Sequence, residues 1–228
     1  MQFLLKVFWM GAGLAAALVE VPALAQTLAV TPPPADVAVI NQLAGEVTYS
    51  AGGPAAKAQA FMRVRQGDRY TIPAGASLRI LYLSNARQET WRGPGALRIG
   101  AVGSEAVAGR PFEVMTLPVA VSQKIARLPD MVQGARLGGV TVRGGGGGRP
   151  PGPVPAAVSE AQATYKVLRS QSSADDVTPE LYLLSVLQEY GYSEEMGPLA
   201  DEIFRRQPGS PEARELAQWA KSRATAAR

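Results

Sequence analysis

Cysteine and histidine are both absent from this 228-residue chain. Without them the protein cannot form a disulfide, use a thiolate nucleophile, transfer protons through an imidazole, or bind a metal through the commonest nitrogen and sulfur ligands. A Ser-His-Asp triad is excluded for the same reason. Only carboxylates remain for acid–base chemistry, and we therefore expect no catalytic site, no cofactor and no metal.

The sequence also lacks a long hydrophobic run. The most apolar stretch, residues 7–19, follows Lys6 and has 13 residues, whereas a membrane-spanning helix needs about 20. A proline and the small-residue triplet Ala-Leu-Ala come next, which predicts a signal peptide over residues 1–25, cleaved between Ala25 and Gln26. Because no cysteine follows that site, we expect a periplasmic protein without a lipid anchor. An uncleaved N-terminal anchor is the alternative.

Glycine and proline are plentiful but unevenly placed. Five consecutive glycines and a proline-rich run predict a flexible linker over residues 144–155. A second proline-rich segment, 26–36, is expected to form an extended spacer. The linker separates parts of opposite charge: residues 26–155 contain 14 Lys and Arg against 7 Asp and Glu, and residues 156–228 contain 8 against 11.

Alternation of apolar and polar residues predicts short strands over residues 37–143. In the clearest strand, 77–82, alternate residues are apolar and Arg79 is expected on the opposite face. Turns containing glycine and proline separate the strands, which favours an all-β sandwich or a coiled β unit. A short helix interrupted by a proline is expected over 119–132, and a last strand over 138–143.

Several arginines fall within the predicted strands. If neighbouring strands bring them together, their guanidinium groups would form a stripe able to pair with phosphate or carboxylate. The candidate anion-binding residues are Arg63, Arg65, Arg69, Arg79 and Arg98. A basic surface that only improves solubility is the alternative.

Turn and packing motifs in this region resemble those of the FecR-like periplasmic domain over about residues 38–117. The matching string is Gly67-Asp68-x-Tyr70-x-x-Pro73-x-Gly75-Ala76-x-Leu78-x-Ile80, preceded by Gly45-x-Val47. The resemblance implies a periplasmic β module. The family's iron-signalling members carry a cytoplasmic segment and a transmembrane helix before this domain, so we do not expect the anti-sigma role to carry over. Asn85-Ala86-Arg87 replaces the family's glycine-containing turn, which excludes a tight Asn-Gly hairpin.

Residues 156–228 change to the 3.6-residue period of amphipathic helices. Four helices are predicted, and Thr178-Pro179 and Ser210-Pro211 are typical helix starts. These starts are 32 residues apart, close to the 34-residue tetratricopeptide period, so this part resembles one degenerate repeat followed by a helix. Such a unit needs a packed neighbour. We expect either the first helix of the region to cap it or the unit to dock on something else.

Aromatic residues on these helices are candidates for contact with a partner protein: Tyr182, Tyr190 and Trp219. The adjacent acids Asp175-Asp176 and Glu194-Glu195 come just before or at predicted helix starts, where negative charge stabilises the helix dipole. We expect these acidic pairs to have structural roles.

The sequence therefore predicts an α+β chain of two domains, with an N-terminal all-β domain and a C-terminal domain of tetratricopeptide-type helical hairpins. The expected function is that of a non-catalytic periplasmic adaptor or sensor that binds a protein partner in the bacterial cell envelope. The first alternative is a module that binds peptidoglycan, acidic glycan or lipid headgroups through the arginine-rich β face. A carboxylate-based glycan hydrolase is the second alternative. Nucleic acid is not expected as a partner.

Overall fold

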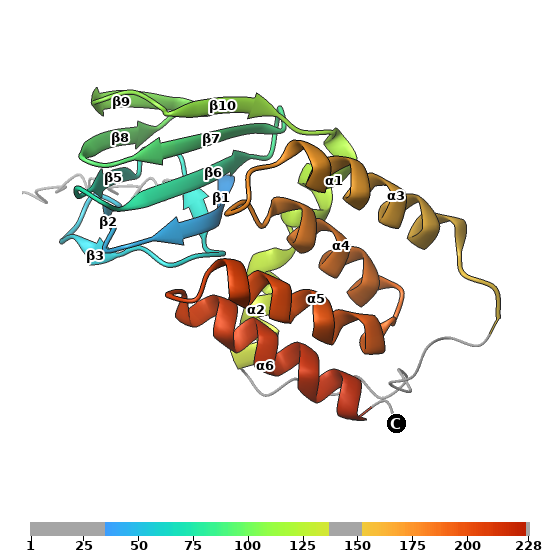
Figure 1. The fold of residues 1–228 in the computed structure, drawn as a ribbon. Coiled ribbons are helices and arrows are strands. Elements are labelled where there is room, and N and C mark those ends of the chain that lie inside the picture. The colour runs from blue at the N-terminus through green and yellow to red at the C-terminus, as the bar shows by residue number, and fades with distance from the viewer. Residues whose placement is uncertain (1–34, 137–151, 227–228) are drawn as a thin grey trace, which may run out of the picture. The chain divides into compact units, whose positions relative to one another are not determined.

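A computed structural model describes residues 35–136 and 152–226 of the chain. The predicted signal peptide, the strand expected over 138–143 and most of the predicted spacer and linker lie outside these described residues. Residues 34–228 cluster into one compact unit. An N-terminal antiparallel β region is followed by helices, as the sequence predicts (Figure 1).

Ten strands form two antiparallel sheets of five strands each in the described part of the chain. The first sheet has the order β10-β7-β6-β1-β4, with bounds β1 Asp36–Ala44, β4 Arg63–Arg65, β6 Ser77–Tyr82, β7 Arg87–Arg92 and β10 Glu113–Thr116. The second sheet has the order β3-β2-β5-β8-β9, with bounds β2 Thr48–Ser50, β3 Ala56–Lys57, β5 Arg69–Ile72, β8 Gly95–Ile99 and β9 Ser104–Ala108. The strands β9 and β10 are therefore edge strands, one in each sheet.

The inner faces of the two sheets share one hydrophobic cluster. Leu78, Ile80 and Tyr82 of β6 lie in it and are almost fully buried, which confirms their expected orientation. Tyr70 and Leu97 come to the same cluster from the second sheet. Alternation along β6 thus provides the first sheet's side of the core.

Six helices follow or cover the strands. Their bounds are α1 Val119–Ile125, α2 Leu128–Arg136, α3 Ala156–Gln171, α4 Thr178–Glu189, α5 Ser193–Arg206 and α6 Pro211–Ala226. The last four match the four predicted amphipathic helices. The helix expected over 119–132 is divided at residues 126–127, and Pro129 lies at the second position of α2, where its missing N–H leaves no hydrogen bond unmade.

The helices cover the second face of the first sheet. Leu81 of β6 and the nearby Ala86 and Phe61 belong to the same buried cluster as the apolar residues of α1 to α6. The strand β6 is consequently buried on both faces, although its sequence alternates as a half-exposed strand would.

The hairpin between β6 and β7 has a loop over residues 83–86, so it is not of the tight two-residue type. Ala86 nevertheless has a positive φ of 55°, a conformation that costs an alanine about 1 kcal/mol. Its methyl group is buried against the helices, and its carbonyl accepts a hydrogen bond from the backbone N–H of Leu117 at 2.9 Å. The surrounding contacts therefore fix this conformation.

Candidate functional site

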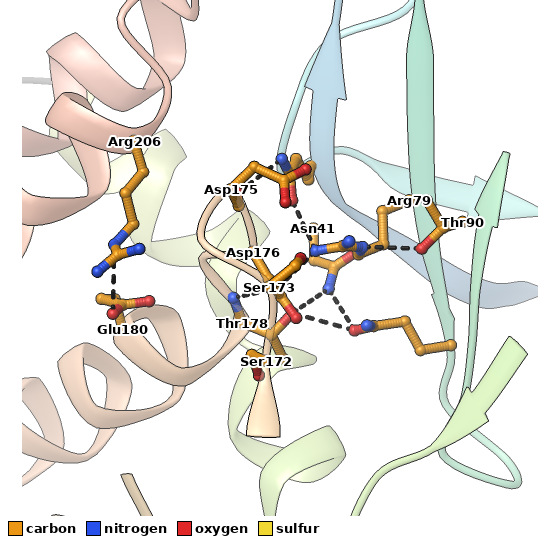
Figure 2. Close-up of polar contacts among 12 residues, drawn as sticks. Asn41, Arg79, Thr90, Ser172, Ser173, Asp175, Asp176, Thr178, Glu180 and Arg206 are labelled. Carbon is orange, nitrogen blue, oxygen red and sulfur yellow. Dashed lines mark hydrogen bonds and ion pairs between the residues drawn. The ribbon is translucent and has the colours of Figure 1, made fainter. Parts of the chain in front are cut away.

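A buried ion pair joins the outer face of β6 to the loop before α4 (Figure 2). The Nη1 atom of Arg79 lies 2.6 Å from Oδ1 of Asp176, and the two side chains are only 5% and 4% exposed. Arg79 also donates hydrogen bonds to Gln42 Oε1 at 2.8 Å and Thr90 Oγ1 at 3.0 Å. The guanidinium is thus paired and hydrogen-bonded, as a buried charge must be.

Side-chain amides next to the Arg79–Asp176 ion pair connect the first sheet to the start of α4. Asn41 Nδ2 donates to Gln88 Oε1 at 2.8 Å and to Thr178 Oγ1 at 2.9 Å. The Thr178 hydroxyl donates to Gln88 Oε1 at 3.0 Å, and the backbone N–H of Thr178 donates to Asp176 Oδ1 at 2.8 Å. Asp176 therefore has the helix-start role expected for it and, in addition, neutralises Arg79.

A second buried carboxylate connects the helices to one another. Glu180 is fully buried, and Arg169 of α3 and Arg206 of α5 lie 3.0 and 3.6 Å from its oxygens. Tyr165 donates to Glu180 at 3.4 Å, and burial followed by the Glu180 charge raises the pKa of this phenol. The Arg79 network holds the start of α4 on the sheet, and the Glu180 network, whose arginines are partly exposed, holds α3, α4 and α5 together.

An open apolar groove lies where β10 leads into α1. Its volume is about 540 Å³, and it is lined on one side by residues 115–118 and on the other by α3. Leu117 and Leu168 form its buried part, while Val167 at its rim is 55% exposed.

Large exposed hydrophobic side chains lie at the rim of this groove, on the two edge strands and next to them. Within residues 35–136 and 152–226 they are Val102, Val107, Phe112, Val114, Val119 and Val167. Val107 lies on β9 and Val114 on β10, strands that run along the same edge of the β region in Figure 1. On β10, Val114 points to the opposite face of the sheet from Met115, which lines the groove. We call this surface, from β9 and β10 to the groove at α3, the apolar edge.

A basic hollow of about 550 Å³ lies at the start of β10, lined by Arg92, Arg110, Pro111 and Phe112. The guanidinium of Arg92 stacks 3.6 Å from the centroid of the Phe112 ring. Among the described residues neither Arg92 nor Arg110 forms an ion pair. The pKa of Asp175 is lowered mainly by a hydrogen bond from Ser173, and the more distant positive charge of Arg92 adds to this effect.

The five predicted anion-binding arginines lie in three places. Arg63 and Arg65 line a polar pocket of about 380 Å³ and share the carboxylate of Asp36, and Arg63 also pairs with Asp130 at 2.9 Å. Arg79 is on the expected face of β6, but the helices bury that face.

The other two arginines, Arg69 and Arg98, are directly opposite each other on β5 and β8 and are exposed. Arg98 pairs with Glu105 at 3.4 Å. The structure thus forms two separate arginine pairs, and no single stripe contains all five residues.

The predicted partner-binding aromatics lie away from the apolar groove. Tyr182 is 6% exposed within the helical cluster, and Tyr190 and Trp219 are partly buried against the same cluster. The residues that line the groove were not predicted from sequence. The alternation over Phe112 to Thr116 was the available signal, but it does not show that β10 is an edge strand.

Comparison of the chain with protein-family models, with curated proteins and with solved structures found no match. Within the described ranges, no three acidic side chains come together in a group that could hold a metal ion. None of the helices in those ranges combines the length and the apolar character that crossing a lipid bilayer requires.

Proposed function

We propose that this protein is a non-catalytic adaptor or sensor module of the bacterial periplasm that binds another protein through its apolar edge. The predicted signal peptide and the FecR-like resemblance support the location. The β region would be the FecR-like module, and α4 and α5 the degenerate tetratricopeptide-type hairpin, capped by α3 and docked on the first sheet.

The observation that carries this proposal is the exposed apolar character of two edge strands. An edge strand offers unpaired backbone groups to other chains, and proteins commonly guard such edges with charged residues or proline. Here each of the two strands exposes one glutamate, Glu105 or Glu113, but also a valine: Val107 on β9 is 66% exposed and Val114 on β10 is 44% exposed. Several exposed apolar side chains on one part of a protein surface are typical of a protein interaction site.

A photoreactive amino acid placed at Val114 or Val167 tests this function in intact cells. We expect both positions to give one discrete cross-linked protein product. A photoreactive residue at Thr71, which is exposed on β5 of the second sheet, is the matched control and should give none. If Val114 and Val167 give no more cross-linked protein than Thr71 does, the apolar edge does not bind a protein and the proposal is wrong.

A second candidate function is anionic ligand binding on the outer face of the second sheet. Like charges directly opposite on adjacent strands destabilise a sheet, and Arg69 and Arg98 have this arrangement. An anionic glycan or lipid headgroup between them would remove the repulsion. Binding of such a ligand should fall as salt rises and should be lost in the variant Arg69→Gln with Arg98→Gln; binding that survives both changes contradicts this candidate.

A further inference from the structure

Two pockets of different chemistry lie at the two ends of β10. The basic hollow of Arg92, Arg110 and Phe112 is at its start, and the apolar groove begins at Met115 and continues past its end. The strand has four residues, and an antiparallel strand rises about 3.4 Å per residue. Phe112 of the hollow and the groove residues 115–118 are therefore three to six positions apart, or about 10–20 Å along an extended chain.

The backbone between the pockets is available for pairing. As the last strand of its sheet, β10 pairs only with β7 among the described strands. Alternate N–H and C=O groups on its outer side can accept an added strand, a common mode of peptide recognition. Every pair in this sheet is antiparallel, and antiparallel pairing is slightly more stable per residue than parallel pairing, so we expect an added strand to run antiparallel to β10.

The positive charge at the start of β10 indicates that the end of such a peptide is negatively charged. Arg92 and Arg110 are exposed and form no ion pair within the described part of the chain, and a guanidinium pairs well with a carboxylate through charge-assisted hydrogen bonds. Glu113 is the acidic residue at this end of β10 and is also exposed. Its charge opposes an incoming carboxylate, so removal of that charge should strengthen binding.

We propose that the β10 edge binds an extended peptide segment that has a carboxylate at Arg92 and Arg110 and an apolar side chain in the α3 groove. Antiparallel pairing places the apolar residue about four residues before the carboxylate. The carboxylate is either the C-terminus of a partner or an Asp or Glu side chain. This inference rests on the proposed function, because it states the chemistry of the partner that binds the same surface.

Three fluorescent peptides test the inference by anisotropy with the purified protein. All begin with leucine and continue with alternating threonine and valine; one ends in a free carboxylate, one in an amide, and one in a glutamate followed by an amide. We expect the neutral amide to bind about tenfold more weakly than the free carboxylate, the equivalent of one charge-assisted hydrogen bond. If the glutamate peptide binds as tightly as the free carboxylate, the site accepts a side-chain carboxylate. If it binds as weakly as the neutral amide, the site requires a C-terminal carboxylate.

Four variants separate the parts of the proposed site. The variant Arg92→Gln with Arg110→Gln should bind all three peptides equally, and Glu113→Gln should bind the free carboxylate more tightly than the unmodified protein does. Val167→Lys places a charge at the groove and should weaken binding of every peptide. Thr71→Lys, on β5 of the second sheet where Thr71 is exposed, is the matched control and should leave binding unchanged.

Equal binding of the neutral and carboxylate peptides by the unmodified protein would overturn this inference. If the cross-links at Val114 and Val167 still form in that case, the proposed function stands and only the peptide chemistry is wrong. Self-association that is abolished by Val167→Lys would instead assign the apolar edge to a second copy of the chain. Binding to phosphatidylglycerol vesicles that is lost in the same variant would assign it to a membrane surface. Either result overturns the inference.

Discussion

Arg79 illustrates how tertiary context changes the role of a residue. In the sequence it is one of several arginines on predicted strands, and alternation places it opposite the core. In the structure it is buried beneath the loop before α4 and pairs with Asp176. A buried ion pair contributes little net stability, but removal of one partner leaves an uncompensated buried charge.

We therefore expect Arg79→Met to lower the free energy of unfolding by about 3–5 kcal/mol. The exposed pair of Arg98 and Glu105 provides the control, because Arg98→Met should cost less than about 1 kcal/mol. Addition of Asp176→Asn to Arg79→Met should recover much of the loss, since the amide keeps the oxygen that accepts from Thr178. Urea unfolding measures all three variants, and equal losses for Arg79→Met and Arg98→Met would contradict the assignment.

Glu89 makes the stability of the β region depend on pH. Burial raises the pKa of its carboxyl, but hydrogen bonds from Ser104, Arg87 and Trp91 outweigh burial and hold the pKa below its ordinary value of 4.5. Glu89 is on β7 of the first sheet and Ser104 on β9 of the second, so this carboxylate links the two sheets.

A group with a lowered pKa in the folded state stabilises the protein above its unfolded pKa, and that stabilisation is lost as pH falls through the folded value. The free energy of unfolding should therefore decrease as pH falls below about 4.5, and it should decrease less in Glu89→Gln. Urea unfolding over a series of acidic pH values tests this. Identical pH dependence in the two proteins would show that Glu89 is not responsible.

The helix α5 forms despite a glycine and a proline near its start. Gly197 lies within α5, where a glycine is less favourable than an alanine by about 0.5–1 kcal/mol. A Cβ added at Gly197 would meet no atom within 4 Å. The tertiary contacts of Met196, Leu199 and Ile203, all buried, therefore compensate for a weak local propensity.

Gly197→Ala should accordingly raise the free energy of unfolding by about 0.5–1 kcal/mol. Gly45→Ala is the contrasting control: Gly45 has φ +81° and an added Cβ would lie 2.8 Å from Cβ of Ala76. We expect this second variant to be less stable than the unmodified protein. Thermal unfolding measures the stability of both variants. A Gly197→Ala variant less stable than the unmodified protein would contradict the prediction that an added methyl group fits beside this glycine.

The helices and the β region depend on one another for burial. The cluster that contains Leu81 and Ala86 of the β region is completed by residues of α3 to α6. Without those helices this cluster would lose most of its members, and Arg79 would lose Asp176. Stability should therefore be shared across residues 34–228, which form one compact unit.

A chain that ends at residue 155 should consequently aggregate or unfold, and the full chain should unfold in one cooperative transition. Trp91, buried in the β core, reports on the sheets in a variant in which Trp9 and Trp219 are both replaced by phenylalanine, while circular dichroism reports on the helices. Coincident unfolding curves support a single cooperative unit. Two separate transitions, or a stable shortened chain, would show that the β region folds independently.

Local patterns in the sequence determined the type and order of most elements. Period-2 alternation predicted β6, the 3.6-residue period predicted α3 to α6, and the Thr-Pro and Ser-Pro starts fall where α4 and α6 begin. The absence of histidine and cysteine by itself excluded whole classes of catalytic chemistry. Such conclusions are possible because helix and strand preferences depend on residues that are near one another in the chain.

Only the tertiary structure decided which faces are covered and which stay open. Arg79 is not free to bind a ligand because it pairs with Asp176. Asp176 is nearly 100 residues later in the chain, and the local pattern of residues cannot predict this pairing. The same holds for β10, whose alternation is that of any strand: only the fold shows that β10 is the last of the described strands in its sheet and that its Val114 is exposed. Burial results from contacts between distant segments, so the apolar edge and its two pockets become visible only once the chain is folded.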